Sequence, residues 1–275
     1  MDVKSFGTDR YAIASCYNGF HIGGGGYTLV RIKLNEVAKK ATSVEDFLEN
    51  VLPYVSTKMI QYIDERIRFL VEETQFFTSN FLVKEGFIQK KLFTGMFGVV
   101  GLAEAVNTLL GAEKQSDRFG YSEKANKLGL RIIEKLNKIV SEHEAKHVNC
   151  FGGQNVSPGC RIPVGEEPEL FNHIMQSAPF HKYFYNGIGD IFVFEDTYND
   201  HPEALVDIIK GAFNLGIRYM SVYGSGADVV RVTGYLAKRS EVEKLERGEA
   251  VLNNTDLFAM GAKNNCHAFE RKIRK

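Results

Sequence analysis

The sequence predicts an α/β protein, because segments with a helical pattern alternate with short segments that have the pattern of strands. Residues 27–34 (YTLVRIKL) alternate bulky apolar with polar or cationic side chains, as a strand with one covered face does. Residues 191–194 (IFVF) are a short apolar run typical of a strand, and the glycine-spaced apolar run at 95–102 (GMFGVVGL) indicates a buried strand or turn. Between these runs, apolar residues recur at helical spacing.

The first long helix is expected to begin after Ser43, a good N-cap with Asp46 three residues later. Apolar side chains then recur every three or four residues, at Phe47, Val51, Val55, Met59, Ile63, Ile67 and Leu70. Pro53 lies within this stripe and predicts a kink, because proline cannot donate a backbone hydrogen bond.

A second helix should follow the strand at residues 95–102 and stop at Gly111, since glycine readily adopts the left-handed conformation of a helix cap. A third helix should begin at Ser122 and end near His147. Residues 149–169 are rich in Gly, Pro, Asn and Ser, which predicts a long loop and a boundary between subregions.

The last third of the chain continues the alternation. Pro202 is expected at the first position of a helix that Gly216 ends. Residues 217–223 (IRYMSVY) and 229–232 (VVRV) predict two more strands, joined by a turn at 224–228. Gly234 lies just beyond the second of these strands.

Charge and composition exclude several classes of protein. The 275 residues contain 34 Lys and Arg against 34 Asp and Glu, so the chain is not a polycationic binder of nucleic acid. No window approaches the roughly 18 apolar residues of a membrane span, and residues 1–10 lack the pattern of a secretion signal. Four cysteines are sparse and fit free thiols in a reducing compartment. We therefore expect a soluble cytoplasmic protein whose partners include neither nucleic acid nor membrane.

The sharpest local signal is RVTGYL at residues 231–236. By local pattern alone it is the end of a strand with a glycine at a turn. The segment also resembles the radical-site motif of the glycyl radical enzyme superfamily, where Arg-Val-x-Gly-Tyr surrounds a glycine near the C-terminus that stores an unpaired electron. The resemblance assigns the radical to Gly234, and it assigns the surrounding loop to Arg231, Val232, Thr233 and Tyr235.

The chemistry explains why this residue is a glycine. A radical on a backbone Cα must become planar to delocalise onto the flanking amides, and only glycine has no Cβ to clash with that geometry. The resemblance implies that no cofactor stays bound and that a radical S-adenosylmethionine activating enzyme installs the radical after translation. It also implies anaerobic conditions, because dioxygen cleaves the chain at such a radical.

Members of this superfamily relay the radical to the substrate through a cysteine thiol, and Cys16 is the candidate. Cys16 lies in YAIASCYNGF, which predicts a short strand that ends in a loop. The neighbouring residues are small or apolar rather than cationic, which favours the neutral thiol that hydrogen-atom transfer needs over a thiolate. The alternative is that Cys16 is an inert buried thiol.

The resemblance extends along the chain. GGGGYTLVRIKLNEVAKKA and GMFGVVGLAEAVNTLLG are similar to the strand-helix units that follow the catalytic cysteine in this superfamily, including its anaerobic ribonucleotide reductase branch. The chain is most like the C-terminal half of the YjjI-type branch, which shares RVTGYL followed by a charged SEVEKL-like segment. This implies the second half of a β/α barrel with a C-terminal glycyl radical loop. Residues 1–200 would form the half-barrel region with the relay-cysteine loop, and residues 201–275 the glycine radical domain.

Three departures remove known substrate classes. Ser15 precedes Cys16, so the paired cysteines of pyruvate formate-lyase are missing, and Asn18 stands where the diol and choline branches have glutamate. The CxxC pairs of anaerobic ribonucleotide reductases are also missing from the sequence.

The resemblance therefore implies hydrogen abstraction from an unknown small molecule. Only fifteen residues precede Cys16, so the chain is expected to be either a glycyl radical enzyme whose barrel a partner chain or a second copy completes, or the C-terminal portion of such an enzyme. The alternative is a non-catalytic remnant or partner subunit that supplies a radical loop to another chain.

Three further features have competing interpretations. His143, His147, Cys150 and Cys160 are weak candidates for a metal site, although histidines near a helix C-terminus also interact favourably with its free carbonyls. The run from Gly23 to Gly26 lacks the spacing of a phosphate-binding loop and precedes a strand. It is better interpreted as a flexible segment that lets the backbone approach a substrate cavity. His21, five residues after Cys16, is either a general acid or base or a histidine satisfied by local hydrogen bonds.

Overall fold

The computed structural model describes residues 11–14, 18–148, 151–153, 167–184, 187–195, 200–224, 230–232, 235–238, 240, 243–244 and 247–249. The chain divides into two compact units, Met1–Val222 and Tyr223–Lys275. The first unit holds most of the described structure and is a mixture of helices and strands, so the predicted α/β class is confirmed. The division of roles at residues 200 and 201 stays a prediction.

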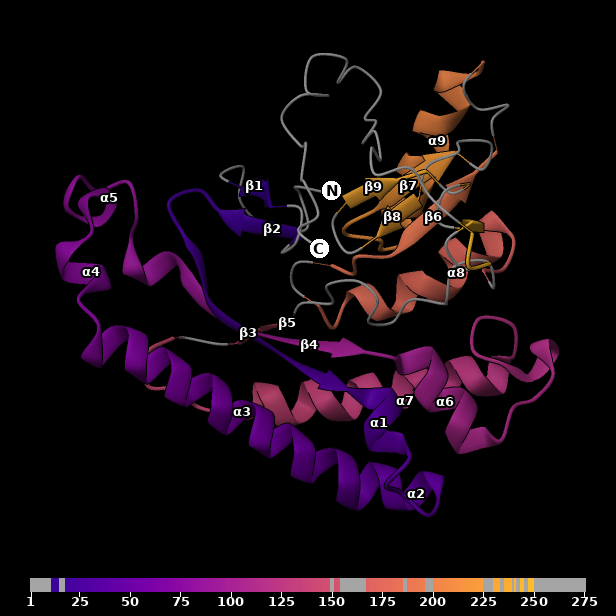
Figure 1. Ribbon diagram of the computed structural model, residues 1–275, viewed down its shortest axis with the longest axis horizontal. Helices are drawn as coiled ribbons and strands as arrows, with labels where there is room; N and C mark the ends of the chain where they lie inside the picture. The colour runs from indigo at the N-terminus through magenta and orange to yellow at the C-terminus, as the bar shows by residue number, and fades with distance from the viewer. Residues whose placement is uncertain are drawn as a thin grey trace. The chain divides into compact units, whose positions relative to one another are not determined.

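The centre of the first unit is a three-stranded parallel sheet in the order β3-β4-β5 (Figure 1). Its strands are β3 (Gly25–Lys33), β4 (Phe93–Val100) and β5 (Phe151–Gly153). The strands predicted at residues 27–34 and 95–102 are confirmed. The loop predicted for residues 149–169 is wrong at β5, which pairs with β4. The sequence FGG does not have the side-chain pattern of a strand, so this pairing could not be predicted from it.

One long helical segment covers the sheet. It comprises α2 (Val44–Asp46), a π-helical turn (Phe47–Val51), α3 (Leu52–Arg68) and a second π-helical turn (Phe69–Glu73). The predicted N-cap is confirmed, since the Ser43 hydroxyl accepts a hydrogen bond from the Asp46 N–H at 3.0 Å. In place of a kink at Pro53, the irregularity is the wide turn just before it, which closes when the Leu52 N–H donates to the Phe47 carbonyl.

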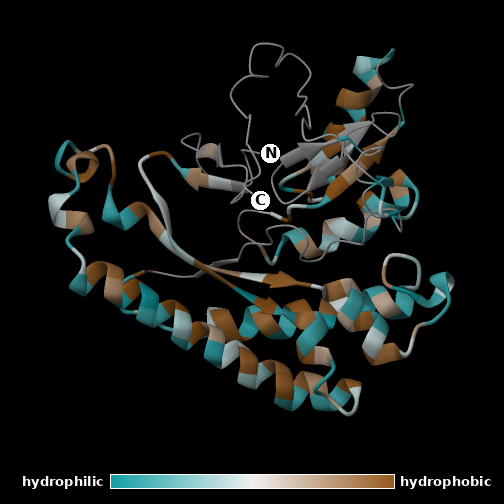
Figure 2. Ribbon diagram, in the orientation of Figure 1, coloured by the Kyte–Doolittle hydropathy of each residue, from teal (hydrophilic) through white to brown (hydrophobic). Residues whose placement is uncertain are grey.

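The π-helical turn rotates the buried face of this segment. The apolar spacing predicted that Val51 and Val55 would be buried after Phe47. Because the wide turn adds one residue, Leu52 and Ser56 are buried in their place, and Val51 and Val55 are only half-buried. Beyond the turn the predicted Met59, Ile63 and Ile67 are buried as expected. Figure 2 shows hydrophobic and hydrophilic residues alternating around α3. Each large apolar side chain buried here stabilises the fold by about 1.5–3 kcal/mol.

The helices that follow β4 keep their predicted starts but not all of their ends. Gly101, at φ 76°, leads into α6 (Leu102–Leu110), and Gly111, at φ 60°, ends it as predicted. Ser122 caps α7 (Glu123–Ser141), which packs beside α3. The expectation that this helix ends near His147 is wrong, because its apolar stripe stops at Val140 and the next residues have no apolar face to bury.

A second, smaller core follows in the first unit, and its buried apolar residues are Ile174, Ala178, Phe192, Phe194, Ala212 and Ile217. Its elements are α8 (Leu170–His181), β6 (Ile191–Phe194) and α9 (Pro202–Asn214). The strand β6 pairs with β7 (Ser221–Gly224), which begins in the first unit and ends in the second. Pro202 and Gly216 start and end α9 as predicted. The strand predicted at residues 217–223 is wrong in its first half, since β7 begins only at Ser221.

Four helices were not predicted from the sequence. They are α8 and three short helices, α1 (Leu34–Ala38), α4 (Phe76–Ser79) and α5 (Phe81–Lys84).

Two antiparallel hairpins complete the description. One pairs β1 (Tyr11–Ala14) with β2 (Asn18–His21), and the other pairs β8 (Val230–Val232) with β9 (Tyr235–Ala237). The strands that the structure describes form sheets of two or three strands, and none of these sheets closes on itself. None of the described helices has the length and apolar composition needed to cross a membrane.

Candidate functional site

The predicted radical motif lies on the hairpin of the second unit. In its register Val232 is opposite Tyr235 and Arg231 is opposite Leu236. The strand predicted at VVRV is confirmed as β8, and two residues separate it from β9. Those two residues are Thr233 and Gly234, which lie outside the described residues. The assignment of the radical to Gly234, and of the loop to its neighbours, stays a prediction.

The predicted relay cysteine lies on the other hairpin. Ala14 is opposite Asn18 in the register of β1 and β2, and Ser15, Cys16 and Tyr17 lie between them. The short strand predicted before Cys16 is confirmed as β1. Cys16 itself lies outside the described residues, so its role is untested by this geometry. His21 ends β2 and has interaction partners.

The glycine run next to this hairpin is required by close packing. A Cβ on Gly24 would lie 2.3 Å from the Leu92 carbonyl oxygen, well inside contact distance. A Cβ on Gly26 would lie 2.1 Å from Cε of Met96 and 3.3 Å from the ring of Phe20 on β2. The glycines therefore let the segment that leads into β3 approach the backbone of Leu92, just before β4, and let β3 approach the side chains of Met96 and Phe20.

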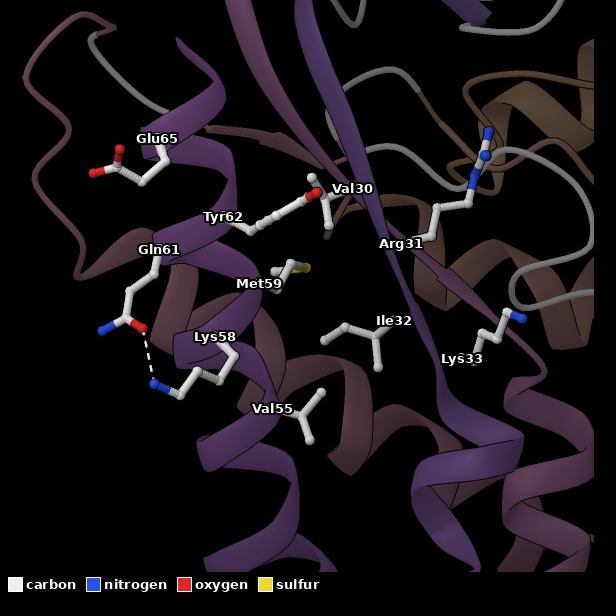
Figure 3. Close-up of a pocket in the computed structure, with 10 residues that line it drawn as sticks. All are labelled: Val30, Arg31, Ile32, Lys33, Val55, Lys58, Met59, Gln61, Tyr62 and Glu65. Atoms are coloured by element: carbon white, nitrogen blue, oxygen red, sulfur yellow. Dashed lines mark hydrogen bonds between the residues drawn. The ribbon is translucent and has the colours of Figure 1, made fainter. Parts of the chain in front are cut away.

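Side chains of β3 alternate between two faces of the sheet. Val30 and Ile32 point toward α3, whereas Arg31 and Lys33 point away from it (Figure 3). The register places Arg31 opposite Gly98 and Leu29 opposite Met96 on β4. Arg31 and Lys33 are both exposed, so this second face of the sheet presents two cations beside a position without a side chain.

A groove of about 520 Å³ lies between β3 and α3 (Figure 3). Its apolar lining includes Val30, Ile32, Val55 and Met59, and a polar rim holds Lys58 and Gln61, which are hydrogen-bonded at 3.1 Å. The groove runs beside β3, which occupies one end of the strand order and pairs only with β4 among the described strands. An apolar groove beside a sheet edge is suited to packing rather than to acid-base chemistry.

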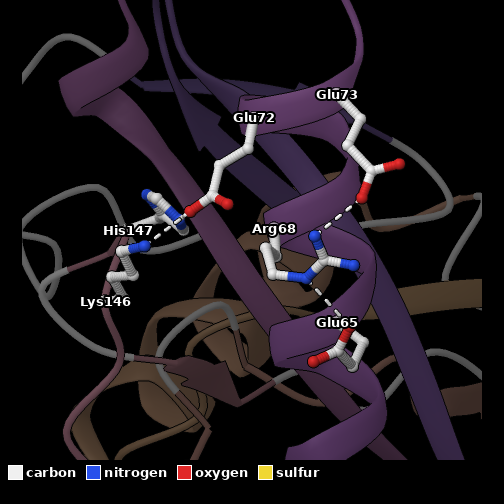
Figure 4. A network of polar contacts seen from close by, with 6 residues as sticks. All are labelled: Glu65, Arg68, Glu72, Glu73, Lys146 and His147. Atoms are coloured by element: carbon white, nitrogen blue, oxygen red, sulfur yellow. Dashed lines mark hydrogen bonds and ion pairs between the residues drawn. The ribbon is translucent and has the colours of Figure 1, made fainter.

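The histidines of the weak metal candidate bind carboxylates. His143 Nε2 lies 2.8 Å from Oδ2 of Asp64, and His147 Nε2 lies 2.8 Å from Oε1 of Glu72. Lys146 contacts the same Glu72 oxygen at 2.7 Å (Figure 4). Hydrogen bonds from Lys146 and His147 lower the pKa of Glu72.

The interpretation that places the histidines near a helix C-terminus fits His143, which lies two residues beyond the end of α7 at Ser141, but not His147, which lies six residues beyond it. Across the described residues, no three His, Cys, Asp or Glu side chains are grouped so that they could hold a metal ion. Cys150 and Cys160 lie outside the described residues.

A buried polar cluster that the sequence pattern did not predict lies between α8 and β6. Oδ2 of Asp190 accepts hydrogen bonds from Ser177 Oγ at 3.2 Å and from His173 Nε2 at 2.9 Å, and its Oδ1 accepts one from the Ile191 N–H at 2.9 Å. Burial by itself would raise the pKa of Asp190, but the charge and hydrogen bond of His173 outweigh it and hold that pKa below its usual value.

His181 lies one helical turn beyond Ser177, also on the buried side of α8. Its Nδ1 accepts backbone hydrogen bonds from Arg218 at 3.1 Å and Ile188 at 3.4 Å, which leaves the proton of the neutral ring on Nε2. That Nε2 is buried and has no hydrogen-bond partner within the described part of the chain. Burial lowers the pKa of His181 to about 3, although the negative charge of Asp190 opposes the shift. The four-residue spacing of His173, Ser177 and His181 is the sequence signal that could have revealed this cluster.

Comparison with known families decides the identity of the chain. The family described as glycyl radical enzyme YjjI-like matches residues 1–274. The chain belongs to this family. The predicted resemblance is therefore confirmed over nearly the whole sequence. Two relatives are an uncharacterised protein of Haemophilus influenzae, 43% identical, and the uncharacterised protein YjjI of Escherichia coli, 39% identical.

This YjjI-like chain spans about half the length of these relatives. The aligned region covers 97% of the chain but 55% of the Haemophilus influenzae protein, and 98% of the chain but 54% of the Escherichia coli protein. Both relatives thus contain a large segment that has no counterpart in the present sequence.

Solved structures show the same fold in part of larger proteins. An anaerobic ribonucleotide reductase from Thermotoga maritima with glycerol in the active site matches with a TM-score of 0.59 at 16% identity. A glycyl radical enzyme from Archaeoglobus fulgidus matches with a TM-score of 0.58 at 13% identity. The matches cover 80% and 86% of the YjjI-like chain, but 44% and 45% of the two larger structures. The fold is thus that of part of a glycyl radical enzyme, with open sheets in the described residues.

Proposed function

We propose that this chain is the portion of a glycyl radical enzyme that carries both radical residues, Gly234 and Cys16. The observation that carries the proposal is the family match over residues 1–274, which includes the complete RVTGYL segment. The pairing of Val232 with Tyr235 supports it, because the hairpin leaves only two residues, one of them Gly234, between its strands.

The proposed relay consists of two hydrogen-atom transfers. The Gly234 Cα radical takes the hydrogen atom of the Cys16 thiol, which regenerates the glycine C–H bond and leaves a thiyl radical. The thiyl radical then takes a hydrogen atom from a C–H bond of a small-molecule substrate, which regenerates the thiol and leaves a substrate radical. Arg231, Val232, Thr233 and Tyr235 would hold the backbone around Gly234 in position for the first transfer.

The radical must be supplied from outside the chain. A radical S-adenosylmethionine activating enzyme would remove one hydrogen atom from Gly234, and the product would survive only without dioxygen. This proposal places the protein in an anaerobic cytoplasm, with the activating enzyme as its partner and the glycyl radical in place of a bound cofactor.

The rest of the barrel is proposed to lie outside these 275 residues, in a further part of the same polypeptide, in another polypeptide or in a second copy. The chain spans about half the length of its curated relatives, and the described sheet leaves one edge of β3 without a strand partner. A closed barrel would shield the thiyl radical from water and from side reactions.

Anaerobic activation followed by electron paramagnetic resonance tests the proposal. The wild-type chain should give a glycine-centred doublet after treatment with an activating enzyme and S-adenosylmethionine. The doublet should be absent in Gly234→Ala. In Cys16→Ser it should form as in the wild type, but transfer of hydrogen to substrate should be lost. A doublet that persists in Gly234→Ala, or its absence in the wild type, would overturn the proposal.

A second candidate function is consistent with the partial coverage of the relatives, of which the chain spans about half. As a non-catalytic partner subunit, it would supply its radical loop to another chain that has lost its own glycyl radical. The two functions differ in the relay, because a supplier of the loop needs Gly234 but not Cys16. If Cys16→Ser restores turnover in a partner enzyme as well as the wild type does, the supplier function holds.

A further inference from the structure

Two cations of β3, Arg31 and Lys33, form no side-chain hydrogen bond or ion pair in the described part of the chain, although the charge of Lys33 helps to lower the pKa of Glu36. Both side chains are exposed. Both project from the face of the sheet opposite α3 (Figure 3). A solvated lysine is common, but two cations on the face of the sheet opposite α3 would meet whatever occupies the interior of the proposed complete barrel.

The hairpin that carries Cys16 packs against this same face. Residues two apart on a strand share a face, and directly opposed residues of parallel strands point to the same side. Leu29 opposes Met96, so Met96 projects on the side of Arg31. The Cβ position of Gly26 faces Cε of Met96 and the ring of Phe20 of β2. The side chain of Phe20 therefore lies on the face that presents the two cations.

The spacing along β3 suits a small molecule. Gly26 and Arg31 are five residues apart, which corresponds to about 16 Å along an extended strand. A flexible arginine side chain together with a small organic molecule spans such a distance. Gly98, the residue opposite Arg31, contributes no side chain to fill the space beside the guanidinium group.

We propose that Arg31, assisted by Lys33, binds an anionic group of the substrate, a carboxylate or a phosphate, and so orients that substrate toward the hairpin of β1 and β2. This inference rests on the proposed function and adds the chemical class of its substrate. The planar guanidinium group of Arg31 can donate two parallel hydrogen bonds to either anion, while Lys33 adds a second positive charge. Two cations are enough for one anionic group and too few for a polyanion.

Calorimetric titration of the activated or unactivated chain with malonate and with inorganic phosphate tests the inference. At low ionic strength the wild type should bind at least one probe, and the probe that binds identifies carboxylate or phosphate. Arg31→Gln should weaken that binding by about tenfold or more, and Lys33→Gln should weaken it less. Arg31→Lys keeps the charge but loses the paired donors, so its affinity should fall between those of the wild type and Arg31→Gln.

Lys124→Gln is the matched control, because Lys124 is an exposed lysine on α7. It should bind the probe as the wild type does. The inference is overturned if the wild type binds neither probe, or if Lys124→Gln weakens binding as much as Arg31→Gln. Circular dichroism should show the same folded state for all four variants, since each altered side chain is exposed.

Anion binding and formation of the glycyl radical can be measured independently, so each proposal can be contradicted without the other. Gly234→Ala should bind the anion as the wild type does, and Arg31→Gln should form the glycyl doublet as the wild type does. Loss of the doublet in the wild type with intact anion binding contradicts the radical function alone. A normal doublet without anion binding contradicts the substrate class alone.

Discussion

His173 Nε2 lies 2.9 Å from Oδ2 of Asp190, and both side chains are only 2% exposed. The pair joins the first half of α8 to the residue that precedes β6. A buried pair of this kind is costly to break, because loss of one partner leaves the other without a hydrogen bond in a region that water does not reach. It therefore fixes the position of α8 on the smaller core.

Replacement of Asp190 by alanine should lower the free energy of unfolding by about 3–5 kcal/mol. The expected loss includes the hydrogen bonds that Asp190 accepts from His173, Ser177 and the Ile191 N–H. Urea denaturation measures the change. Asp207→Ala is the control, since Asp207 is an exposed carboxylate of α9 with only a weak ion pair to Lys210, and its change should stay within about 0.5 kcal/mol. Equal effects of the two substitutions would contradict a structural role for Asp190.

His181 should make the folded state less stable in acid. Its pKa is about 3 in the folded protein, against about 6.5 in an unfolded chain. Between these values the unfolded state binds a proton that the folded state does not, so stability is fully present above pH 6.5 and falls as the pH drops toward 3. At pH 5 the loss from this residue alone should be about 2 kcal/mol relative to pH 7.

His181→Gln isolates this effect, because glutamine keeps an acceptor oxygen for the backbone N–H groups and does not titrate. Urea denaturation at pH 7 and pH 5 should show a smaller decrease for this variant than for the wild type. Asp190 does not confound the comparison. Its pKa is lowered, so its contribution is lost only below the ordinary pKa of aspartate, near pH 3.9. An equal decrease in both proteins would show that His181 is protonated in the folded state at pH 5.

Gly24→Ala should destabilise the protein strongly, because the new Cβ would lie 2.3 Å from the Leu92 carbonyl oxygen and one of the two chains must shift. We expect a loss of about 2 kcal/mol or more from such overpacking. Gly211→Ala is the opposite case. Gly211 is in α9 with no atom within 4 Å of its Cβ position, so alanine should stabilise the helix by about 0.5–1 kcal/mol. Thermal unfolding of the two variants should shift the melting temperature in opposite directions, and a shift of the same sign would contradict the close packing at Gly24.

Ser43→Ala should lower the free energy of unfolding by about 1 kcal/mol, the usual cost of losing an N-cap. The substitution removes the hydrogen bond from the Asp46 N–H to the Ser43 hydroxyl. Thr57→Ala serves as the control, because Thr57 is exposed within α3 and donates only to the Pro53 carbonyl. Since alanine is the better helix former, that control should be neutral or slightly stabilising. A neutral result for Ser43→Ala in urea denaturation would show that Asp46, which also accepts from the Thr42 N–H, is sufficient for the cap.

Local chemistry made much of the fold predictable. Ser43, Gly111, Pro202 and Gly216 act within one or two turns of chain, and each starts or ends a helix as predicted. The π-helical turn before Pro53 could not be predicted from the spacing of apolar residues. The sequence contains apolar residues both at positions that a regular helix would bury and at positions that a helix with one extra residue would bury. The strand β5 was missed because its pairing with β4 involves backbone groups rather than a side-chain pattern.

The candidate site was predictable only where a motif is contiguous. RVTGYL can be recognised as a motif from the sequence alone. In contrast, Asp190 and His173 lie seventeen residues apart and meet only because α8 packs on β6. Arg31 is an ordinary strand arginine in the sequence. Its proposed role in binding depends on the strand register, which places it opposite Gly98, and on the position of Phe20 at the same face of the sheet. Both arise only when the chain folds, so neither could be predicted from the sequence.

The outer edge of β3 bears on how the isolated chain behaves in solution. Its N–H and C=O groups have no strand partner among the described residues, and such an edge is a template on which another copy of the protein can add a strand. The charges of Arg31 and Lys33 oppose a second copy that approaches with its own cations. We therefore expect the purified chain to aggregate more readily at high salt, where these charges are screened, than at low salt.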